Sequence, residues 1–174
     1  MQHEITPHIG VAGFMLGMSR AECRAILPSL TDCSTKLGMM IIPADISEKD
    51  GIRLEYMEDD DGDEEKATLM SITLRAPASP AIFGSRLLNL RMGDAGDLLE
   101  RLDPETYLED DVFLSPCHGL EVGTDNPSAE DDDSLMHAPV TYVVVCNPLD
   151  EEHEEVSIRL EKEERDRRQK QSGK

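Results

Sequence analysis

The feature that most constrains the fold of this chain is a short helix start that occurs twice. At Gly13–Leu27 an apolar, glycine-containing segment leads into Ser19, and Glu22 follows three residues later. This spacing is typical of a capping box, in which the serine oxygen accepts the N–H of the glutamate and the carboxylate accepts the N–H of the serine. The segment therefore predicts a helix that begins after Ser19 and is interrupted by Pro28.

A similar pattern lies 75 residues later, at Leu88–Leu102, where Asp94 takes the place of Ser19 as the expected N-cap and Asp97 takes the place of Glu22. Each helix precedes two expected strands, an acidic loop and a third strand, and the expected strands are Lys36–Ile42, Ile52–Met57, Ala67–Arg75, Val112–Ser115, Gly119–Val122 and Val140–Cys146. The shared order of elements predicts a tandem repeat, with units at residues 5–76 and 82–147.

The segments between these strands are polar. We expect Ala44–Gly51 to be a polar connection, and Glu58–Lys66 and Gly123–His137 to be acidic loops. Each unit alone would leave one face of its sheet bare. The expected fold is therefore α+β: two helix-plus-antiparallel-strand repeats forming one sheet, with short helices packed on it. Val140–Cys146 is nearly continuously apolar and is expected to be a central strand.

The repeats together form the expected single domain, residues 1–149, and a charged tail follows at residues 150–174. Within the tail, Leu160–Gln169 places glutamates four residues before arginines, a spacing that favours a solvated helix. Such a polar helix adds nothing to a core, so the tail is either mobile or a docking element.

The net charge of −20 restricts the kinds of partner that the chain can bind. Residues 1–149 hold 28 acidic and ten basic side chains, so most of the negative charge lies in the domain. A field of this sign repels phosphate, which argues against binding to nucleic acid or to an anionic membrane. It favours rapid association with a basic protein. The alternative is that the acidity only keeps the chain soluble or reflects a salt-adapted proteome.

Three acidic segments hold 18 of those 28 acids, at Glu58–Glu65, Asp103–Asp111 and Glu121–Asp133. If the repeat is correct, the first and third contain equivalent hairpin tips, which could lie along a common edge of the sheet. The candidate partner-binding residues are Asp59, Asp60, Asp61, Asp63, Glu64, Glu65, Asp110, Asp111, Glu130, Asp131, Asp132 and Asp133. The alternative is that these tips are charged only because they are solvated.

No pattern in the sequence matches a known catalytic or metal site. Asp59 and Asp61 fit two positions of a calcium-binding EF-hand loop, but Met57 and Thr68 stand where its first and last ligands are required. The five histidines are scattered, and neighbouring residues such as Cys117 and His118 would point to opposite faces of a strand. The segment around them is better interpreted as a turn. We therefore predict a protein that is not an enzyme and has no metal or cofactor, with an enzyme of unrecognised type as the remaining alternative.

The sequence predicts a cytoplasmic protein. Its start is polar, and no apolar run approaches the ~20 residues of a membrane span. The four cysteines lack metal-binding spacing and are expected to be reduced and buried.

The run Leu16–Cys23, followed by strand, acidic loop and strand, resembles the start of outer-membrane SmpA/BamE-type domains. Its doubled form is similar to the beta-lactamase-inhibitor-protein architecture, in which two helix-plus-sheet units form a concave binding surface. Small acidic bacterial proteins of this kind also resemble immunity proteins of toxins. These resemblances imply a binding protein rather than an enzyme.

The leading hypothesis is an acidic cytoplasmic binding protein that inhibits a basic partner by occlusion, as an immunity protein does for a bacterial toxin or effector. The alternative is an effector or secretion chaperone, or an adaptor, that acts through its tail.

Overall fold

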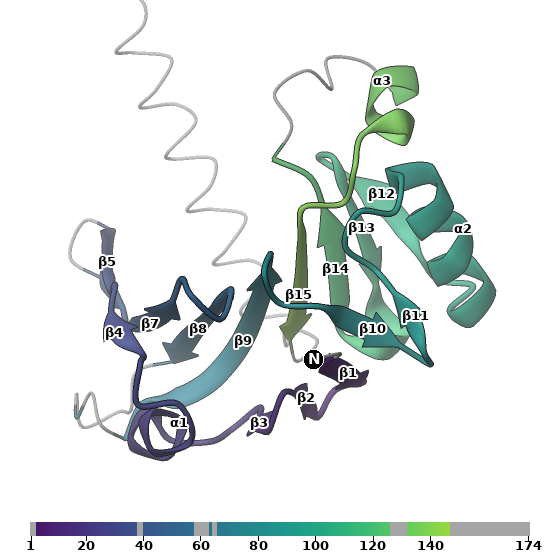
Figure 1. Ribbon diagram of the computed structural model, residues 1–174. Helices are drawn as coiled ribbons and strands as arrows, with labels where there is room; N and C mark the ends of the chain where they lie inside the picture. The colour runs from purple at the N-terminus through teal and green to yellow at the C-terminus, as the bar shows by residue number, and fades with distance from the viewer. Residues whose placement is uncertain (1–2, 38–39, 58–62, 64–65, 126–131, 147–174) are drawn as a thin grey trace, which may run out of the picture.

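The computed structural model of the chain describes residues 3–37, 40–57, 63, 66–125 and 132–146. Within these residues the chain is an α+β protein, in which short strands form three sheets and the helices are few and short (Figure 1). The α+β class agrees with the expectation from the sequence, but the described strands form three sheets rather than the single sheet that was expected.

The largest sheet has eight strands in the order β12-β13-β14-β15-β9-β8-β7-β4, and every neighbouring pair is antiparallel. Its strands are β4 (Thr31–Asp32), β7 (Ala44–Ser47), β8 (Ile52–Met57), β9 (Thr68–Arg75), β12 (Tyr107–Glu109), β13 (Val112–Ser115), β14 (Leu120–Gly123) and β15 (Tyr142–Cys146). The expected central position of the apolar strand near residue 140 is confirmed, because β15 pairs with β9 in the middle of this sheet.

A smaller sheet has the order β11-β10-β1-β2-β3, in which β1 and β10 are parallel. Its strands are β1 (His3–Thr6), β2 (Gly10–Val11), β3 (Phe14–Met15), β10 (Pro80–Ile82) and β11 (Ser85–Arg86). A separate hairpin joins β5 (Thr35–Leu37) and β6 (Met40–Ile42).

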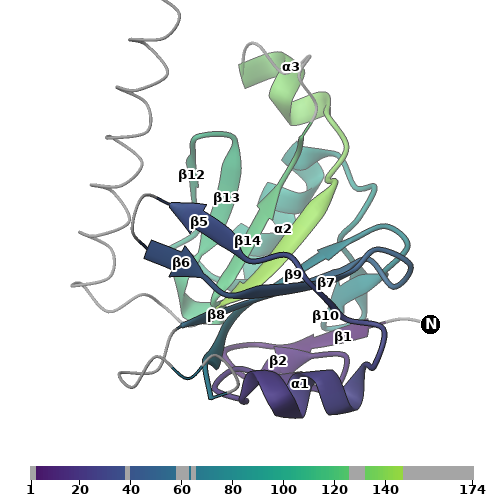
Figure 2. The ribbon, with the colours of Figure 1, turned by 90° about the vertical axis from the view of Figure 1, so that its left-hand side faces the viewer.

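Helices α1 (Arg20–Ile26) and α2 (Met92–Leu102) pack on the same face of the eight-stranded sheet. Residues that pair directly across strands share a face, and one such row is Asp45, Leu54, Ile72, Val145, Leu120 and Ser115. Arg20 of α1 contacts Asp45 in this row, and Gly96 of α2 lies against Phe113, on the same side of β13 as Ser115. The sheet twists strongly, so α1 lies below β8 and β9 in Figure 2, whereas α2 lies behind β14.

The predicted capping box of α1 is confirmed. Glu22 N–H donates to Ser19 Oγ at 3.3 Å, and Ser19 N–H donates to Glu22 Oε2 at 2.8 Å. The helix ends at Ile26, before Pro28, as expected.

The predicted start of α2 is wrong. Its N-cap is Arg91 rather than Asp94, and Arg91 makes no side-chain capping hydrogen bond. Backbone pairing fixes this start, because Leu90 accepts the N–H of Val140 and Met92 donates to Ala138 O. Asp94 instead lies in the first turn, where a carboxylate interacts favourably with the helix dipole.

Three expectations about the connections are also corrected. The single strand expected at Lys36–Ile42 is the β5–β6 hairpin, and the polar connection expected at Ala44–Gly51 contains strand β7. The acidic loop expected at Gly123–His137 contains helix α3 (Asp132–His137). The tail, residues 150–174, lies outside the described residues.

The core is aliphatic, with Leu54, Ile72, Leu74 and Val143 fully buried. All four cysteines are free, as predicted. Their expected burial holds for Cys23 but not for Cys117, which is exposed. None of the helices in the described ranges has the length and apolar character that crossing a membrane requires.

Candidate functional site

The structure describes five of the twelve predicted partner-binding acids. Asp63 is exposed and pairs with Lys66 at 3.3 Å, and Asp110 and Asp111 form the exposed turn between β12 and β13. Asp132 and Asp133 begin α3, and the Asp133 side chain is 97% exposed. The remaining seven lie outside the described residues: Asp59, Asp60, Asp61, Glu64, Glu65, Glu130 and Asp131.

The two acidic hairpin connections do not share an edge of the sheet, contrary to the expectation. Strands β9 and β15 are antiparallel, so that Arg75 pairs with Tyr142 and Ser71 pairs with Cys146. The connection between β8 and β9 therefore joins the sheet at one end, and the connection between β14 and β15 joins it at the other. The Asp110–Asp111 turn lies at the second end, because Val112 pairs with Gly123.

Negative charge affects the ionisation of groups at this second end. Arg75 forms an ion pair with Asp125 and places its guanidinium 4.8 Å from the centre of the Tyr142 ring. Burial, followed by the charges of Asp125 and Glu121, raises the pKa of the Tyr142 phenol. The phenol therefore stays neutral at physiological pH and can still donate a hydrogen bond.

The side of the sheet opposite α1 and α2 forms a continuous surface, to which seven neighbouring strands each contribute one residue: β7, β8, β9, β15, β14, β13 and β12. Among the described residues no helix lies on this side, and we call it the helix-free face. Its central row is Ile46, Arg53, Thr73, Val144, Glu121, Leu114 and Tyr107. These side chains are half-buried, except that Tyr107 is 46% exposed. This row was not predicted from the sequence, although the alternation of Leu120, Glu121 and Val122 along β14 could have indicated it.

The helix-free face combines apolar side chains with paired charges. Arg53 forms an ion pair with Glu55, two residues further along β8, at 2.9 Å. Burial and then the charge of Glu121 raise the pKa of the Cys146 thiol to about 12. The thiol is therefore protonated and unreactive at neutral pH.

A buried charge cluster holds α1 against β7. Asp45 has no exposed surface and accepts hydrogen bonds from Arg20 Nη2 at 2.7 Å, Arg24 Nη2 at 2.9 Å and the Tyr56 hydroxyl at 3.2 Å. Burial alone would raise the pKa of Asp45, but the hydrogen bonds from both arginines hold it below its ordinary value. Because its partners come from the chain itself, the cluster has a structural role.

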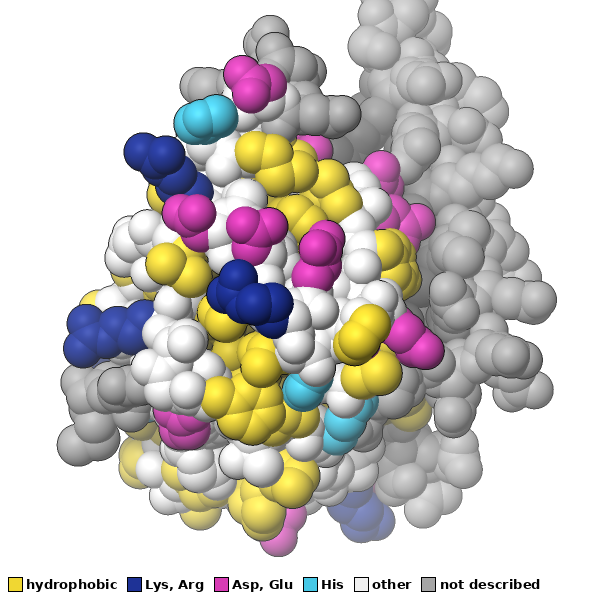
Figure 3. All heavy atoms as spheres, turned by 90° about the vertical axis from the view of Figure 1, so that its right-hand side faces the viewer, with side chains coloured by type: hydrophobic (Ala, Val, Ile, Leu, Met, Phe, Trp, Pro, Cys, Tyr) yellow, Lys and Arg dark blue, Asp and Glu magenta, His cyan; other side chains and the backbone are white. Residues whose placement is uncertain are grey.

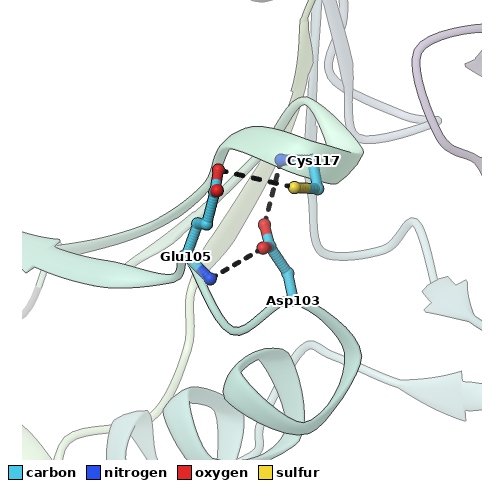
Figure 4. A group of neighbouring side chains, drawn as sticks. All are labelled: Asp103, Glu105 and Cys117. Carbon is cyan, nitrogen blue, oxygen red and sulfur yellow. Dashed lines mark hydrogen bonds between the residues drawn. The ribbon is translucent and has the colours of Figure 1, made fainter.

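A second cluster surrounds Asp103 at the end of α2 (Figure 4). Its buried carboxylate accepts hydrogen bonds from the Ser115 hydroxyl at 2.7 Å and from the backbone N–H groups of Cys117 and Glu105 at 2.9 Å. Burial opposes ionisation, but these donors lower the pKa of Asp103. Since the single hydroxyl proton of Ser115 is used on Asp103, the 3.1 Å contact between Ser115 Oγ and His118 Nδ1 requires His118 Nδ1–H to donate.

The same cluster contains the one group among the described residues with the composition and spacing of a metal site. Carboxylate and thiol atoms of Asp103, Glu105 and Cys117 lie within 4.8 Å of one another. However, Asp103 already accepts three hydrogen bonds. A hydrogen bond with Asp103, burial, and the negative charges of Asp103 and Glu105 raise the pKa of the Cys117 thiol to about 11. The protonated thiol is a poor nucleophile and metal ligand. The residues around Cys117 form a 3₁₀ turn, η1 (Pro116–His118), as the turn interpretation predicted, and Asp103 anchors this turn.

The described residues also line an open groove of about 530 Å³ between α1 and β1. Its floor is apolar, with Phe14 and Ile26, and its rim carries Lys49 and Asp50. Asp50 accepts hydrogen bonds from the hydroxyls of Ser47 and Ser29, so its carboxylate is already held by the chain.

No protein-family model matches the chain, and no curated protein matches its sequence. Among solved structures, the fold is similar to the uncharacterized protein YfeY from Escherichia coli, with a TM-score of 0.48 and 9% identity. The match covers 84% of this chain and 99% of that chain. This similarity assigns neither a family nor a function.

Proposed function

We propose that this chain is an acidic binding protein that inhibits a basic partner by covering its working surface, as an immunity protein covers a bacterial toxin or effector. One observation carries the proposal: the helix-free face is continuous across seven strands, and acidic connections join the sheet at both of its ends. A basic protein would be attracted to those ends and would then bury the apolar part of the face.

The composition of the face supports these separate roles for its acidic ends and its apolar centre. Val144, Leu114 and Tyr107 supply apolar area in its central row, and burial of such side chains stabilises a complex by roughly 25 cal/mol per Å². Acidic groups at the periphery mainly increase the rate of encounter, and their contribution weakens as salt is added. A partner with a basic rim and an apolar centre is the complement of this surface.

The proposal includes the tandem arrangement of the chain. The two helix starts attach to the sheet in the same way, because Gly17 N–H donates to Leu69 O at 2.7 Å and Asn89 N–H donates to Val140 O at 3.1 Å. Both donors have left-handed backbone, with φ of 86° at Gly17 and 68° at Asn89.

The turns that lead into β8 and β14 give independent support. Gly51 and Gly119 both have positive φ, where a Cβ would overlap the carbonyl oxygen of Arg75 or Cys146. Each glycine carbonyl accepts an N–H at 2.9 Å from the last residue of the third strand, Arg75 in β9 or Cys146 in β15. A duplicated unit accounts for a face made of two similar halves that meet at the β9–β15 pair.

Co-purification with the product of the neighbouring gene, at low and at high salt, tests the proposed function. We expect a stoichiometric complex that abolishes the partner's activity and weakens as salt is raised. The double variant Asp110→Asn/Asp111→Asn should slow association, because it removes two charges while asparagine tolerates the positive φ of this turn. The matched control is Asp94→Asn/Asp97→Asn, which removes the same charge from the exposed surface of α2.

An acidic partner, or association that is equally fast in both double variants, would contradict the proposal. Deleting residues 161–174 separates the alternative function: a chaperone or adaptor that acts through the tail would lose its partner, whereas an inhibitor that acts through the sheet would keep it.

A further inference from the structure

Phe83 is exposed at the tip of the β10–β11 hairpin and has an unusual backbone conformation. Its side chain is 63% exposed, more than any other large hydrophobic residue described, and its φ is 47°. A bulky residue with positive φ is a strained outlier, and such strain concentrates at functional sites. Figure 3 shows this side of the molecule, where hydrophobic side chains lie beside histidines.

The ring of Phe83 is held in place before any partner arrives. It contacts the His118 ring edge-on, with 6.0 Å between centroids and 80° between planes. His118 is fixed in turn through Ser115, which donates to the buried Asp103. On the other side of the tip, Gly84 N–H donates to Glu4 Oε1 at 2.9 Å. A rigid aromatic side chain loses little conformational entropy on binding.

A second exposed apolar residue lies on a turn that is docked onto η1. Ile9 is 52% exposed on the β1–β2 turn, and its neighbour His8 docks this turn onto η1. The His8 backbone N–H donates to His118 O at 3.3 Å, and His8 Nε2 donates to Cys117 O at 2.8 Å. Phe83 and Ile9 therefore lie on two turns that both contact η1, Phe83 through the His118 ring and Ile9 through its neighbour His8, and we call this surface the Phe83 knob.

Two carboxylates bind residues that are next to Phe83 and His118 in the chain. Glu4 reaches the Phe83 knob through Gly84, and Glu105 reaches it through Cys117, whose Sγ donates to Glu105 Oε2 at 3.7 Å. Both glutamates are solvent-exposed. A pocket that accepts the ring would therefore gain from cationic groups at its rim, which would meet these two carboxylates.

We propose that the Phe83 knob is an anchor that inserts into an apolar pocket with a cationic rim on a second protein, separate from the partner on the helix-free face. Aromatic residues, Phe among them, are enriched in protein interfaces relative to the rest of the protein surface. The occupant is a folded pocket rather than a flat surface, because the ring stands out from a hairpin tip.

Aminated β-cyclodextrin, a soluble apolar cavity with a cationic rim, is a probe of this chemistry. Titrated into the full chain and followed by NMR, it should give saturable shifts of the Phe83 and His118 ring protons. Neutral β-cyclodextrin should bind several-fold more weakly, and added salt should remove the difference. The variant Phe83→Asn should weaken binding of the aminated host at least tenfold.

Asparagine adopts positive φ readily, so Phe83→Asn should unfold at the same urea concentration as the parent chain or at a higher one. Met15→Ala is the matched control, because Met15 is 51% exposed on β3 at the opposite edge of the smaller sheet. Equal binding by Phe83→Asn, or equal affinity for the neutral host, would overturn the proposal. So would self-association that Phe83→Asn abolishes, since the occupant would then be a second copy. None of these measurements involves the basic partner, so their failure would leave the proposed function untouched.

Discussion

Asp45 shows how one buried residue can decide the stability of half of this molecule. Its carboxylate has no exposed surface and lies between two arginines of the same helix face, Arg20 and Arg24. Two buried or half-buried guanidinium groups need this negative charge, because an unpaired buried charge is far more costly than an unpaired surface charge. Asp45 joins β7 to α1, whereas an apolar contact joins β13 to α2, because Phe113 packs against Gly96.

We expect Asp45→Asn to lower the free energy of unfolding by about 3–5 kcal/mol, since it keeps the shape of the side chain but removes the buried counter-charge shared by both arginines. The other carboxylate bound to Arg20, that of Asp32, is 56% exposed and cannot replace a buried charge. Urea titration followed by circular dichroism measures the change. Glu55→Gln is the control, because Glu55 pairs with Arg53 in a half-exposed position on the helix-free face, where loss of a pair costs at most about 1 kcal/mol. Equal losses in the two variants would show that the buried cluster has no special role.

At the level of elements, the two main helices differ in how they begin. Ser19 caps α1 with its side chain, whereas Arg91 begins α2 without a side-chain hydrogen bond. An arginine at a helix N-terminus also interacts unfavourably with the helix dipole. The same position is therefore optimised in one helix and not in the other.

This difference predicts opposite effects of two substitutions. Ser19→Ala should destabilise the protein by about 1 kcal/mol through loss of the capping box, and Arg91→Ser should stabilise it by about 0.5–1 kcal/mol by supplying a cap. Thermal unfolding at fixed pH and salt measures both. Arg91→Ala separates the cap from the removed charge: if it stabilises as much as Arg91→Ser, the cap explanation is wrong.

The elements that sequence reasoning predicted are those encoded by local chemistry. The Ser19–Glu22 pair fixes α1 within one turn, and the alternation of Ile52–Met57 fixes β8. Strand β7 was missed because Asp45, its buried central residue, has a polar side chain whose partners lie on α1. The start of α2 was misplaced because it depends on pairing with residues near Val140, which are distant in sequence.

At the scale of the whole molecule, the acidic segments were identified from the sequence, but their arrangement was not. The β8–β9 and β14–β15 connections would lie at the same end of the sheet only if β9 and β15 ran in the same direction. The pairing of Val144 with Thr73 shows the opposite, because β9 and β15 are antiparallel. No local feature of either acidic loop contains this information, so the helix-free face had to be found from the register of the strands.

Both halves of the molecule depend on carboxylates that must stay ionised, and this sets an acid limit on stability. Hydrogen bonds from Ser34 are the main cause that lowers the pKa of Asp32 to about 2 from an ordinary value of 3.8. Burial would raise the pKa values of Asp45 and Asp103, yet both lie below the ordinary value of 3.8. Hydrogen bonds from Arg20 and Arg24 lower the pKa of Asp45. Hydrogen bonds from Ser115, Glu105 and Cys117 lower the pKa of Asp103. A group whose pKa is lower in the folded state contributes stability above its unfolded pKa and loses it as pH falls through its folded pKa.

We therefore expect the free energy of unfolding to fall steeply as the pH drops from about 4 towards 2. The net charge of −20 acts in the other direction, since protonation of surface carboxylates relieves repulsion. The specific losses should dominate, because Asp45 and Asp103 have no exposed surface and each binds several donors. Urea titrations at constant ionic strength between pH 7 and 2 measure the balance. In Asp45→Asn the decline below pH 4 should be shallower, and a stability that rises continuously to pH 2 would mean that charge repulsion, rather than the buried carboxylates, controls this fold.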